Sequence, residues 1–353
     1  MVGDTIIADA TVHAYNWSEE NYAIPIASMT TAAGLGFHGW LTTDEASKLT
    51  EAEFRRNWSA AELEQALFFE SPVDLASHHG TPIWDYYKDG HSDTAKGFEL
   101  RELQPDRTIV YGAVNPFHGE KCLEDVQRLV EEHHVDGIKV YAARYDQGKT
   151  YEQRLDDPEF GYPMIEKCLE LGVRVIATHK AVPFGPVRSE AYGMRDLPEV
   201  CAVFPEMNFE IVHAGFAFIE DTAFLAGFPN VWLNLEFSAA LVTKAPRRVA
   251  EFIGAFATMG GADRMLFSTT CCLLHPRFVI EEFMKLEMPQ DLVDGFGYPE
   301  ITPELMDGIM GLNYLRLHGI DPDEFRARIA GDAVSLAQAE GLAAPWSSLR
   351  GER

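Results

Sequence analysis

The stretch that decides the fold is RMLFSTTCCLLHPRF, residues 264–278. Met265–Thr269 is a short apolar run typical of a buried strand, and it ends abruptly in small polar residues and two cysteines. His275 and Pro276 follow, and then the amphipathic run 278–288 begins. A buried strand that ends in reactive side chains is typical of the mouth of an α/β barrel, where the C-terminal strand ends form the active site.

Seven more apolar runs of strand length precede this one, and most are separated by segments with helical periodicity. Alternation of this kind predicts parallel pairing and closure of the sheet. We therefore expect an α/β protein, a single (β/α)8 TIM barrel. The predicted strands are Thr5–Thr11, Val73–Ser77, Thr108–Val114, Gly137–Tyr141, Val173–Thr178, Phe209–Val212, Asn230–Leu235 and Met265–Thr269.

The length of 353 residues suits one barrel that carries insertions. We predict one barrel domain over residues 1–342, with a long irregular insertion after the first strand at 16–72. A structureless segment of that length is expected to be functional, here as a cap over the barrel mouth. Extra helices are expected within 299–342, and residues 343–353 are expected to form a polar tail that frays.

Composition excludes several classes of partner. The net charge of −26 would repel a nucleic-acid backbone, and no apolar run reaches the roughly 18 residues that span a bilayer. The first residues lack the positive segment of a secretory signal. Five cysteines without framework spacing indicate free thiols in a reducing cytoplasm. A small-molecule substrate is therefore the expected partner.

Histidines gather at the predicted strand ends. Neutral imidazole is the commonest metal ligand, so three or four converging histidines predict a first-row metal site, most naturally zinc. For any single histidine, a buried structural role is the alternative. The candidate residues at or near strand ends are Thr11, His13, His78, His79, Asn115, Lys139, Arg144, His179, His213, Glu236, Thr270, Cys272 and His275.

Two of these residues have several possible roles. Glu236 is the available general base or anionic ligand. Lys139 could bind a substrate carboxylate, act as a catalytic amine, form a carbamylated metal bridge, or simply pair with Glu236. The adjacent His78 and His79 face opposite sides of their strand, so we expect only one of them to point into the pocket.

The sequence carries a family likeness in the segments ADATVHAYNW, IVYGAVNPF, VDGIKVY, VRVIATH, FEIVHAGF, NVWLNLEFS, ADRMLFSTTCCLLHPR and IMGLNYLRLHGID. Together they resemble the amidohydrolase superfamily, over nearly the whole chain. The similar branch includes aminocarboxymuconate-semialdehyde decarboxylase and related aromatic-acid decarboxylases and hydrolases.

The resemblance implies a divalent metal, zinc or manganese, held by an H-x-H pair, a further histidine and an aspartate, with another histidine in catalysis. His13 matches the second residue of the pair, His179 the further ligand, and His213 the catalytic histidine. Thr11 and Thr270 stand where the first histidine and the aspartate are expected. Neither threonine can replace a zinc ligand or a metal-bound base.

Three outcomes therefore stay open. A reduced metal site could persist with help from Glu236, His78 or Cys272, which shares the face of Thr270 if its strand continues. Alternatively, the pocket could work by acid–base chemistry without a metal. It could also bind a ligand without catalysis.

The expected function is hydrolysis of a small organic acid, ester, amide or lactone, with His213, Glu236, Lys139 and His275 as catalytic or orienting groups. The alternative is a decarboxylase or another lyase acting on a small aromatic carboxylic acid. In that case, Lys139 and Arg144 would hold the substrate carboxylate. The resemblance also suggests a homodimer.

Overall fold

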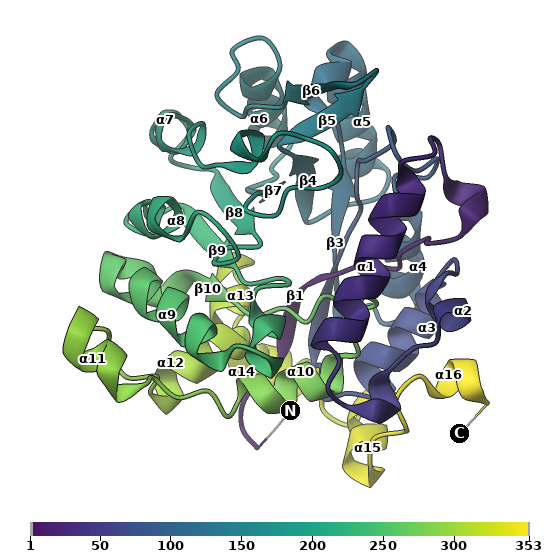
Figure 1. Ribbon diagram of the computed structural model, residues 1–353, viewed down its shortest axis with the longest axis vertical. Helices are drawn as coiled ribbons and strands as arrows, with labels where there is room; N and C mark the ends of the chain where they lie inside the picture. The colour runs from purple at the N-terminus through teal and green to yellow at the C-terminus, as the bar shows by residue number, and fades with distance from the viewer. Residues whose placement is uncertain (1–2, 352–353) are drawn as a thin grey trace.

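An eight-stranded parallel sheet, curled into a nearly closed barrel, forms the centre of the computed structural model, which describes residues 3–351 (Figure 1). Its strand order, β1-β2-β3-β4-β7-β8-β9-β10, follows the chain. This confirms the predicted (β/α)8 barrel and all eight of its strands. They are β1 Ala8–Val12, β2 Leu75–His79, β3 Thr108–Ala113, β4 Gly137–Tyr141, β7 Val175–His179, β8 Asn208–Val212, β9 Val231–Asn234 and β10 Met265–Leu266.

The last strand is shorter than predicted. Beyond Leu266, side chains add to the backbone bonds: the Ser268 hydroxyl donates to the Thr11 carbonyl at 2.7 Å, and the Thr269 amide donates to the Asp9 carboxylate at 3.0 Å. The Ala10 amide donates to the Phe267 carbonyl at 2.9 Å, and the His13 amide to the Cys271 carbonyl at 2.6 Å. Backbone and side-chain hydrogen bonds thus join the first and last strands together.

Helices surround the barrel, as expected for the fold. In α5, for example, the apolar residues Cys122, Val126 and Leu129 are buried while the intervening charged residues face solvent. The helices are α1 Ala27–Leu41, α2 Glu51–Phe54, α3 Ala60–Glu64, α4 Thr94–Leu103, α5 Glu120–Glu131, α6 Gly161–Glu170, α7 Leu197–Val203, α8 Ile219–Leu225, α9 Pro246–Phe256, α10 Pro276–Phe283, α11 Gln290–Phe296, α12 Pro303–Asp307, α13 Asn313–Leu317, α14 Pro322–Ile329, α15 Ala333–Glu340 and α16 Ser347–Arg350.

The insertion after the first strand is more regular than predicted. It contains the 15-residue helix α1 and the short helices α2 and α3, both of which begin with a capping box, at Thr50 and Ser59. The helix α1 was missed because its sequence is apolar on nearly every side and shows no 3.6-residue periodicity.

The C-terminal segment is docked on the barrel, in contrast to the predicted frayed tail. Trp346 is 1% exposed, and its ring lies 5.2 Å from that of Trp58. The amides of Trp346 and Ser347 donate to the buried carboxylate of Glu70. Residues 343–351 therefore belong to the folded domain.

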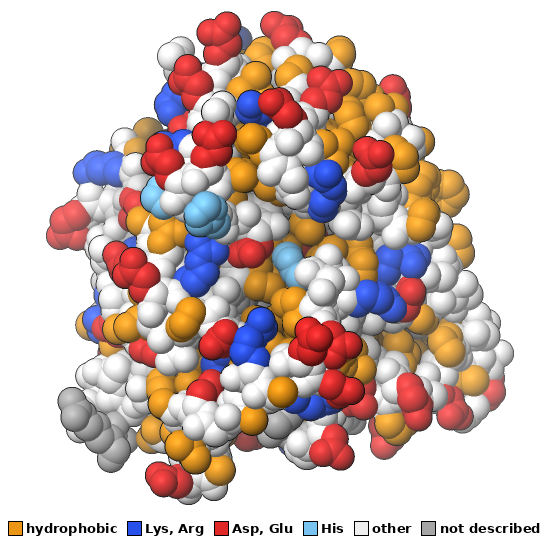
Figure 2. Space-filling model, turned by 180° about the vertical axis from the view of Figure 1, so that it is seen from behind, with side chains coloured by type: hydrophobic (Ala, Val, Ile, Leu, Met, Phe, Trp, Pro, Cys, Tyr) orange, Lys and Arg blue, Asp and Glu red, His pale blue; other side chains and the backbone are white. Residues whose placement is uncertain are grey.

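A two-stranded hairpin, β5 Ala143–Asp146 and β6 Lys149–Glu152, follows β4 and was not predicted (Figure 1). Acidic side chains are spread over the face in Figure 2, in keeping with the net charge of −26. Among the helices of residues 3–351, none is long and apolar enough to cross a membrane.

Candidate active site

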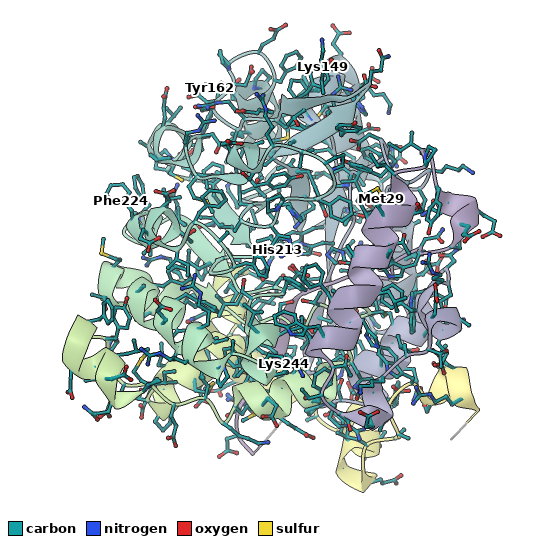
Figure 3. All side chains as sticks on the ribbon, viewed as in Figure 1. Met29, Lys149, Tyr162, His213, Phe224 and Lys244 are labelled. Carbon is teal, nitrogen blue, oxygen red and sulfur yellow. The ribbon has the colours of Figure 1, made fainter. Side chains whose placement is uncertain are left out.

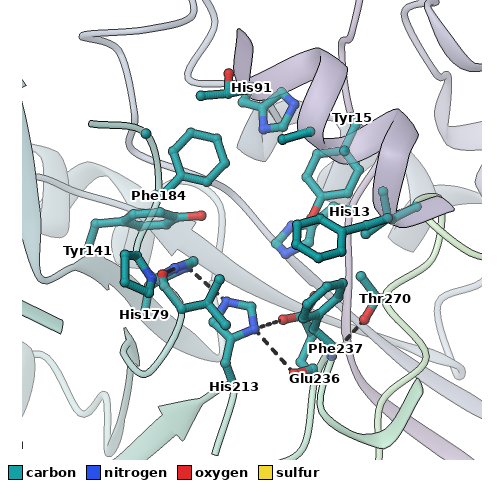
Figure 4. Close-up of a pocket in the computed structure, with 18 of the residues that line it drawn as sticks. His13, Tyr15, His91, Tyr141, His179, Phe184, His213, Glu236, Phe237 and Thr270 are labelled. Atoms are coloured by element: carbon teal, nitrogen blue, oxygen red, sulfur yellow. Dashed lines mark hydrogen bonds and ion pairs between the residues drawn. The ribbon is translucent and has the colours of Figure 1, made fainter. Parts of the chain in front are cut away.

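Four side chains from four different strand ends face one cavity at the barrel mouth (Figure 4). His13 follows β1, His179 ends β7, His213 follows β8, and Glu236 lies two residues beyond β9. The cavity has a volume of about 140 Å³. The C-terminal ends of parallel strands meet at one end of a barrel, which explains why these four residues come together.

The hydrogen bond of His13 fixes which ring nitrogen is free. Its Nδ1 lies 2.7 Å from the carbonyl oxygen of His79. Because a carbonyl only accepts, Nδ1 carries the proton and Nε2 holds a lone pair. Burial lowers the pKa of His13 well below its usual value, while the negative charge of Glu236 opposes that change. His13 is therefore a neutral base at neutral pH.

His179, His213 and Glu236 form a hydrogen-bonded row. His179 Nε2 lies 2.7 Å from the carbonyl oxygen of Val182, so Nε2 donates and Nδ1 must accept. His213 Nε2 hydrogen-bonds His179 Nδ1 at 3.0 Å. His213 Nδ1 lies 3.2 Å from the backbone carbonyl oxygen of Glu236 and also contacts the Glu236 carboxyl group. The row therefore runs from the Val182 carbonyl through two imidazole rings to Glu236.

Burial acts in opposite directions on the two ends of this row. It lowers the pKa of His179 and His213 well below the usual value, and it raises the pKa of Glu236. The Thr270 hydroxyl bonds the carboxyl group of Glu236 and opposes the rise.

The cavity walls are apolar and aromatic. Within residues 3–351, no lysine or arginine lines the cavity. Tyr141 stacks on His179 with ring centroids 4.2 Å apart, and Tyr15 packs against His13 at 4.8 Å. Such walls favour a ligand that is small, neutral and largely apolar. Among the aromatic lining residues, the sequence suggested only Phe37, as one of several aromatic residues of the insertion that could form a pocket wall. Nothing local marks the others, which are Tyr15, Trp17, Tyr141, Phe184 and Phe237.

The backbone at three of the strand ends is left-handed. His213, Phe237 and Thr270 have φ values of 69°, 62° and 67°. Non-glycine residues rarely adopt this conformation, which costs on the order of 1–3 kcal/mol and is concentrated at functional sites. Here it turns the chain sharply where the strands reach the cavity.

Two candidates from the opening stretch lie outside the cavity. The ring of His275 is fully buried, bonds the Glu70 carboxylate at 3.0 Å and accepts from the Arg277 amide, so it caps α10. Cys272 is buried and does not line the cavity. The alternation of side chains along a strand did not predict the position of Cys272, because the strand ends at Leu266. All five cysteines are free, as predicted.

The β2 histidines and Thr11 are also structural. His78 bonds the Ser92 hydroxyl at 3.2 Å, and His79 stacks on Tyr111 with centroids 4.2 Å apart. The Thr11 hydroxyl accepts from Asn234 at 2.7 Å. Thr11, His78 and His79 do not line the cavity. Thr270 does, and it is the only predicted site residue besides His13, His179, His213 and Glu236 that lines it.

Lys139 is buried but does not line the cavity. In the described part of the chain its Nζ has no hydrogen-bond partner, and no acid lies within ion-pair distance of it. Burial lowers its pKa to about 8, against the opposing charges of Glu236 and Glu210. Asn115 and Arg144 line a different cavity.

The donor set does not fit the divalent metal that the resemblance implies. Among residues 3–351, no three His, Cys, Asp or Glu side chains converge as a metal site. Both ring nitrogens of His179 are occupied by hydrogen bonds, and two expected ligands are Thr11 and Thr270. Hydroxyls of this kind are poor ligands for zinc.

Comparisons with known proteins agree with this architecture. A TIM-barrel protein from Bordetella bronchiseptica is 18% identical and has a TM-score of 0.64, with 89% of this chain and 98% of that chain covered. For 5-carboxyvanillate decarboxylase from Novosphingobium aromaticivorans, solved with manganese, the identity is 14%, the TM-score 0.57, and the coverage 90% and 96%.

A probable 2-pyrone-4,6-dicarboxylic acid hydrolase from Acinetobacter baumannii is 10% identical, with a TM-score of 0.53 and coverage of 89% and 99%. At these identities the likeness concerns the fold. A search of curated proteins finds no match. The family model described as "Amidohydrolase" matches residues 89–320, which is most of the chain and includes three of the four residues that face the cavity. The chain therefore belongs to the amidohydrolase family.

Proposed function

We propose that this protein hydrolyses a small, neutral, largely apolar carbonyl compound, an ester, amide or lactone, by acid–base chemistry. One observation carries the proposal: the free nitrogen of His13, the His179–His213–Glu236 row and the Tyr141 ring share one apolar cavity (Figure 4). Such a cavity with a few convergent polar groups is the usual form of a small-molecule site.

His13 acts as the general base. Its Nε2 takes a proton from a water molecule, whose oxygen attacks the carbonyl carbon. The charge of Glu236 raises the pKa of His13 and so stabilises the imidazolium that forms. When the carbonyl re-forms, the bond to the leaving oxygen or nitrogen breaks, and His13 returns its proton to that atom. The products are a carboxylic acid and an alcohol or amine.

Tyr141 and Tyr15 stabilise the negative charge that develops on the carbonyl oxygen. Burial raises the pKa of both hydroxyls well above the usual value, so both remain protonated donors. Figure 4 shows the Tyr141 hydroxyl directed into the cavity. Hydrogen-bond donors already held in place supply a large part of the catalysis of acyl transfer.

Hydrolysis is favoured over decarboxylation by the charges around the cavity. Decarboxylation of an aromatic acid requires a group that holds the substrate carboxylate, and the expected groups were Lys139 and Arg144. Neither lines this cavity. Solved structures of two decarboxylases of this fold contain manganese, but the donor set here supports a mechanism without a metal step. A homodimeric state and a cytoplasmic location remain predictions from the sequence.

The test is hydrolysis of p-nitrophenyl acetate and dihydrocoumarin, a neutral aryl ester and an aryl lactone, by the purified protein before and after dialysis against EDTA. Elemental analysis of the same samples reports bound zinc and manganese. We expect turnover that EDTA does not change. His13→Ala should lower kcat/KM by about 10²–10⁴-fold without changing the circular dichroism spectrum.

Three results would contradict the proposal. The first is about one equivalent of metal whose removal abolishes turnover. The second is unchanged turnover in His13→Ala. The third is ligand binding without any turnover, which identifies a binding protein. His133→Ala is the matched control, because His133 lies far from the cavity, next to Phe98 on the outside of the barrel.

A further inference from the structure

A second cavity, of about 630 Å³, lies beside the β5–β6 hairpin. We call it the hairpin cavity; the lining residues that matter here are Trp84, Asn115, His118, Arg144, Tyr145 and Asp146. They come from the segments that follow β2, β3 and β4, so this cavity also opens on the C-terminal side of the barrel. In Figure 3, Lys149 marks the hairpin at the periphery, well away from His213.

An aromatic partition separates the hairpin cavity from the candidate active site. Tyr86 stacks on Tyr145, which lines the hairpin cavity, with ring centroids 6.3 Å apart. On its other side, Tyr86 contacts the ring of Phe184, which lines the active site, at 5.6 Å. The two cavities are therefore distinct sites with different linings.

Arg144 is held in place without using its hydrogen-bond donors. Its guanidinium lies 4.7 Å from the Tyr151 ring centroid and 5.8 Å from that of Phe117. Its one ion pair, with Asp146, spans 4.0 Å, and its Nε is buried without a partner among the described residues. A guanidinium held by aromatic rings with free donors is arranged for a planar, two-oxygen anion.

Asn115 adds a second donor. Its side-chain oxygen already accepts from the Phe117 amide at 3.0 Å and from Gln153 Nε2 at 2.6 Å. Its Nδ2 group is then left to donate towards the cavity. Two donor groups without protein acceptors among the described residues line this cavity, and together they match the two oxygens of a carboxylate.

Two stacked aromatic rings also line the hairpin cavity. Trp84 and His118 stack with centroids 6.0 Å apart and interplanar angle 28°. Burial and the nearby cations Lys121 and Arg144 lower the pKa of His118, so its ring is neutral at neutral pH. A flat apolar group can pack against these rings.

We propose that the hairpin cavity is a binding site for a small organic carboxylate with a planar group. The carboxylate lies between Arg144 and Asn115, and the planar group packs on Trp84 and His118. The proposal goes beyond the proposed function and does not depend on it, because binding here requires no turnover. Asp85 and Asp146 also line the cavity, and Arg144 is its only lysine or arginine among the described residues, so the charges favour a ligand with a single anionic group.

The test is titration of the full-length protein with benzoate by isothermal calorimetry, with no substrate present. Arg144→Met should weaken benzoate binding by roughly tenfold or more, since a hydrogen-bonded charge is lost. Arg144→Lys keeps the charge but loses the planar fork, so we expect a weakening of several fold. Arg128→Met, on the exposed face of α5, is the matched control and should bind like the wild type.

Four outcomes would overturn the proposal. They are no heat of binding with wild-type protein at about 10 mM benzoate, wild-type affinity in Arg144→Met, equal weakening in Arg128→Met, and displacement of benzoate by an equal concentration of inorganic phosphate. Loss of benzoate binding in His13→Ala would place the ligand in the active site and would also refute it. Failure of these tests leaves the hydrolysis assay unaffected.

Discussion

Replacing Glu70 by glutamine tests how the C-terminal segment is held on the barrel. The Glu70 carboxylate is fully buried. It accepts hydrogen bonds from the Trp346 amide at 2.6 Å, from the Ser347 amide at 2.8 Å and hydroxyl at 2.6 Å, and from His275 Nε2 at 3.0 Å. One carboxylate thus connects three distant parts of the chain.

The size of the effect follows from these bonds. A glutamine side chain has one acceptor oxygen, and its NH₂ group would face donors that the carboxylate now satisfies. A hydrogen bond to a charged group contributes about 1.5–3 kcal/mol, so the loss of two costs about 3–6 kcal/mol. Total domain stabilities are about 5–15 kcal/mol, so Glu70→Gln should be strongly destabilising.

The pH dependence gives a second signature. Burial alone would raise the pKa of Glu70, but hydrogen bonds from His275, Ser347 and Trp346 outweigh it and hold the pKa below the usual value. The stabilisation by Glu70 is therefore present above its unfolded pKa and is lost as the pH falls through the lower folded pKa. Glu70→Gln removes this component at every pH.

Urea unfolding followed by tryptophan fluorescence measures the change, because Trp346 and Trp58 pack together beside this site. Glu166→Gln, on the exposed side of α6, is the control. A loss of less than about 1 kcal/mol in Glu70→Gln would refute the reasoning, because it would mean that the four hydrogen bonds add little to docking.

Three further predictions concern the barrel and its cavity. Burial raises the pKa of the Asp9 carboxyl group from its usual 3.8 to about 6. The folded protein therefore loses about 3 kcal/mol of stability as the pH rises through this range. Asp9→Asn should abolish that loss, as urea unfolding at pH 4 and pH 7 would show. Tyr141→Phe should lower kcat on p-nitrophenyl acetate by about 10²–10³-fold, and an unchanged kcat would exclude it as an oxyanion donor. Glu236→Gln should shift the acidic limb of the pH profile of kcat/KM to lower pH, because the Glu236 charge raises the pKa of His13. An unchanged acidic limb would contradict this effect of Glu236 on His13.

The barrel fold and the central residues of the candidate active site could be predicted from local sequence patterns. Apolar runs of strand length alternate with helical segments, and this alternation predicts the parallel strand order of the barrel. Residues at or immediately after a strand end, such as His13, His179 and His213, then converge because parallel strands end on one side. Further along the chain after a strand end this reasoning fails, and for that reason His275 and Cys272, well beyond Leu266, were wrongly placed in the cavity.

Contacts between distant segments could not be predicted. Trp346 and Glu70 are 276 residues apart, and no local feature of either segment marks their hydrogen bond. The helix α1 supplies Thr30, Gly34 and Phe37 to the cavity, but its apolar sequence has no face that a pattern could assign. In Gly34 the constraint becomes visible only in three dimensions, since a Cβ there would lie 2.8 Å from the Trp17 ring.

Thr11 and Thr270, at the positions where the resemblance implies metal ligands, have structural roles that bear on the proposed chemistry. The Thr11 hydroxyl accepts from Asn234, whose amide also bonds Glu210 and whose oxygen accepts from the Glu236 amide at 2.8 Å. The Thr270 hydroxyl accepts from the Phe237 amide at 2.7 Å.

Both threonines therefore help to fix the end of β9, and with it the carboxylate that meets His213. Restoring a histidine at 11 and an aspartate at 270 would break these bonds and place a second acid beside Glu236. Such a change would disturb the His179–His213–Glu236 row, on which the proposed site depends, and so would not simply add a metal ligand. The two threonines thus support the proposed site, which depends on a fixed arrangement of hydrogen bonds around Glu236.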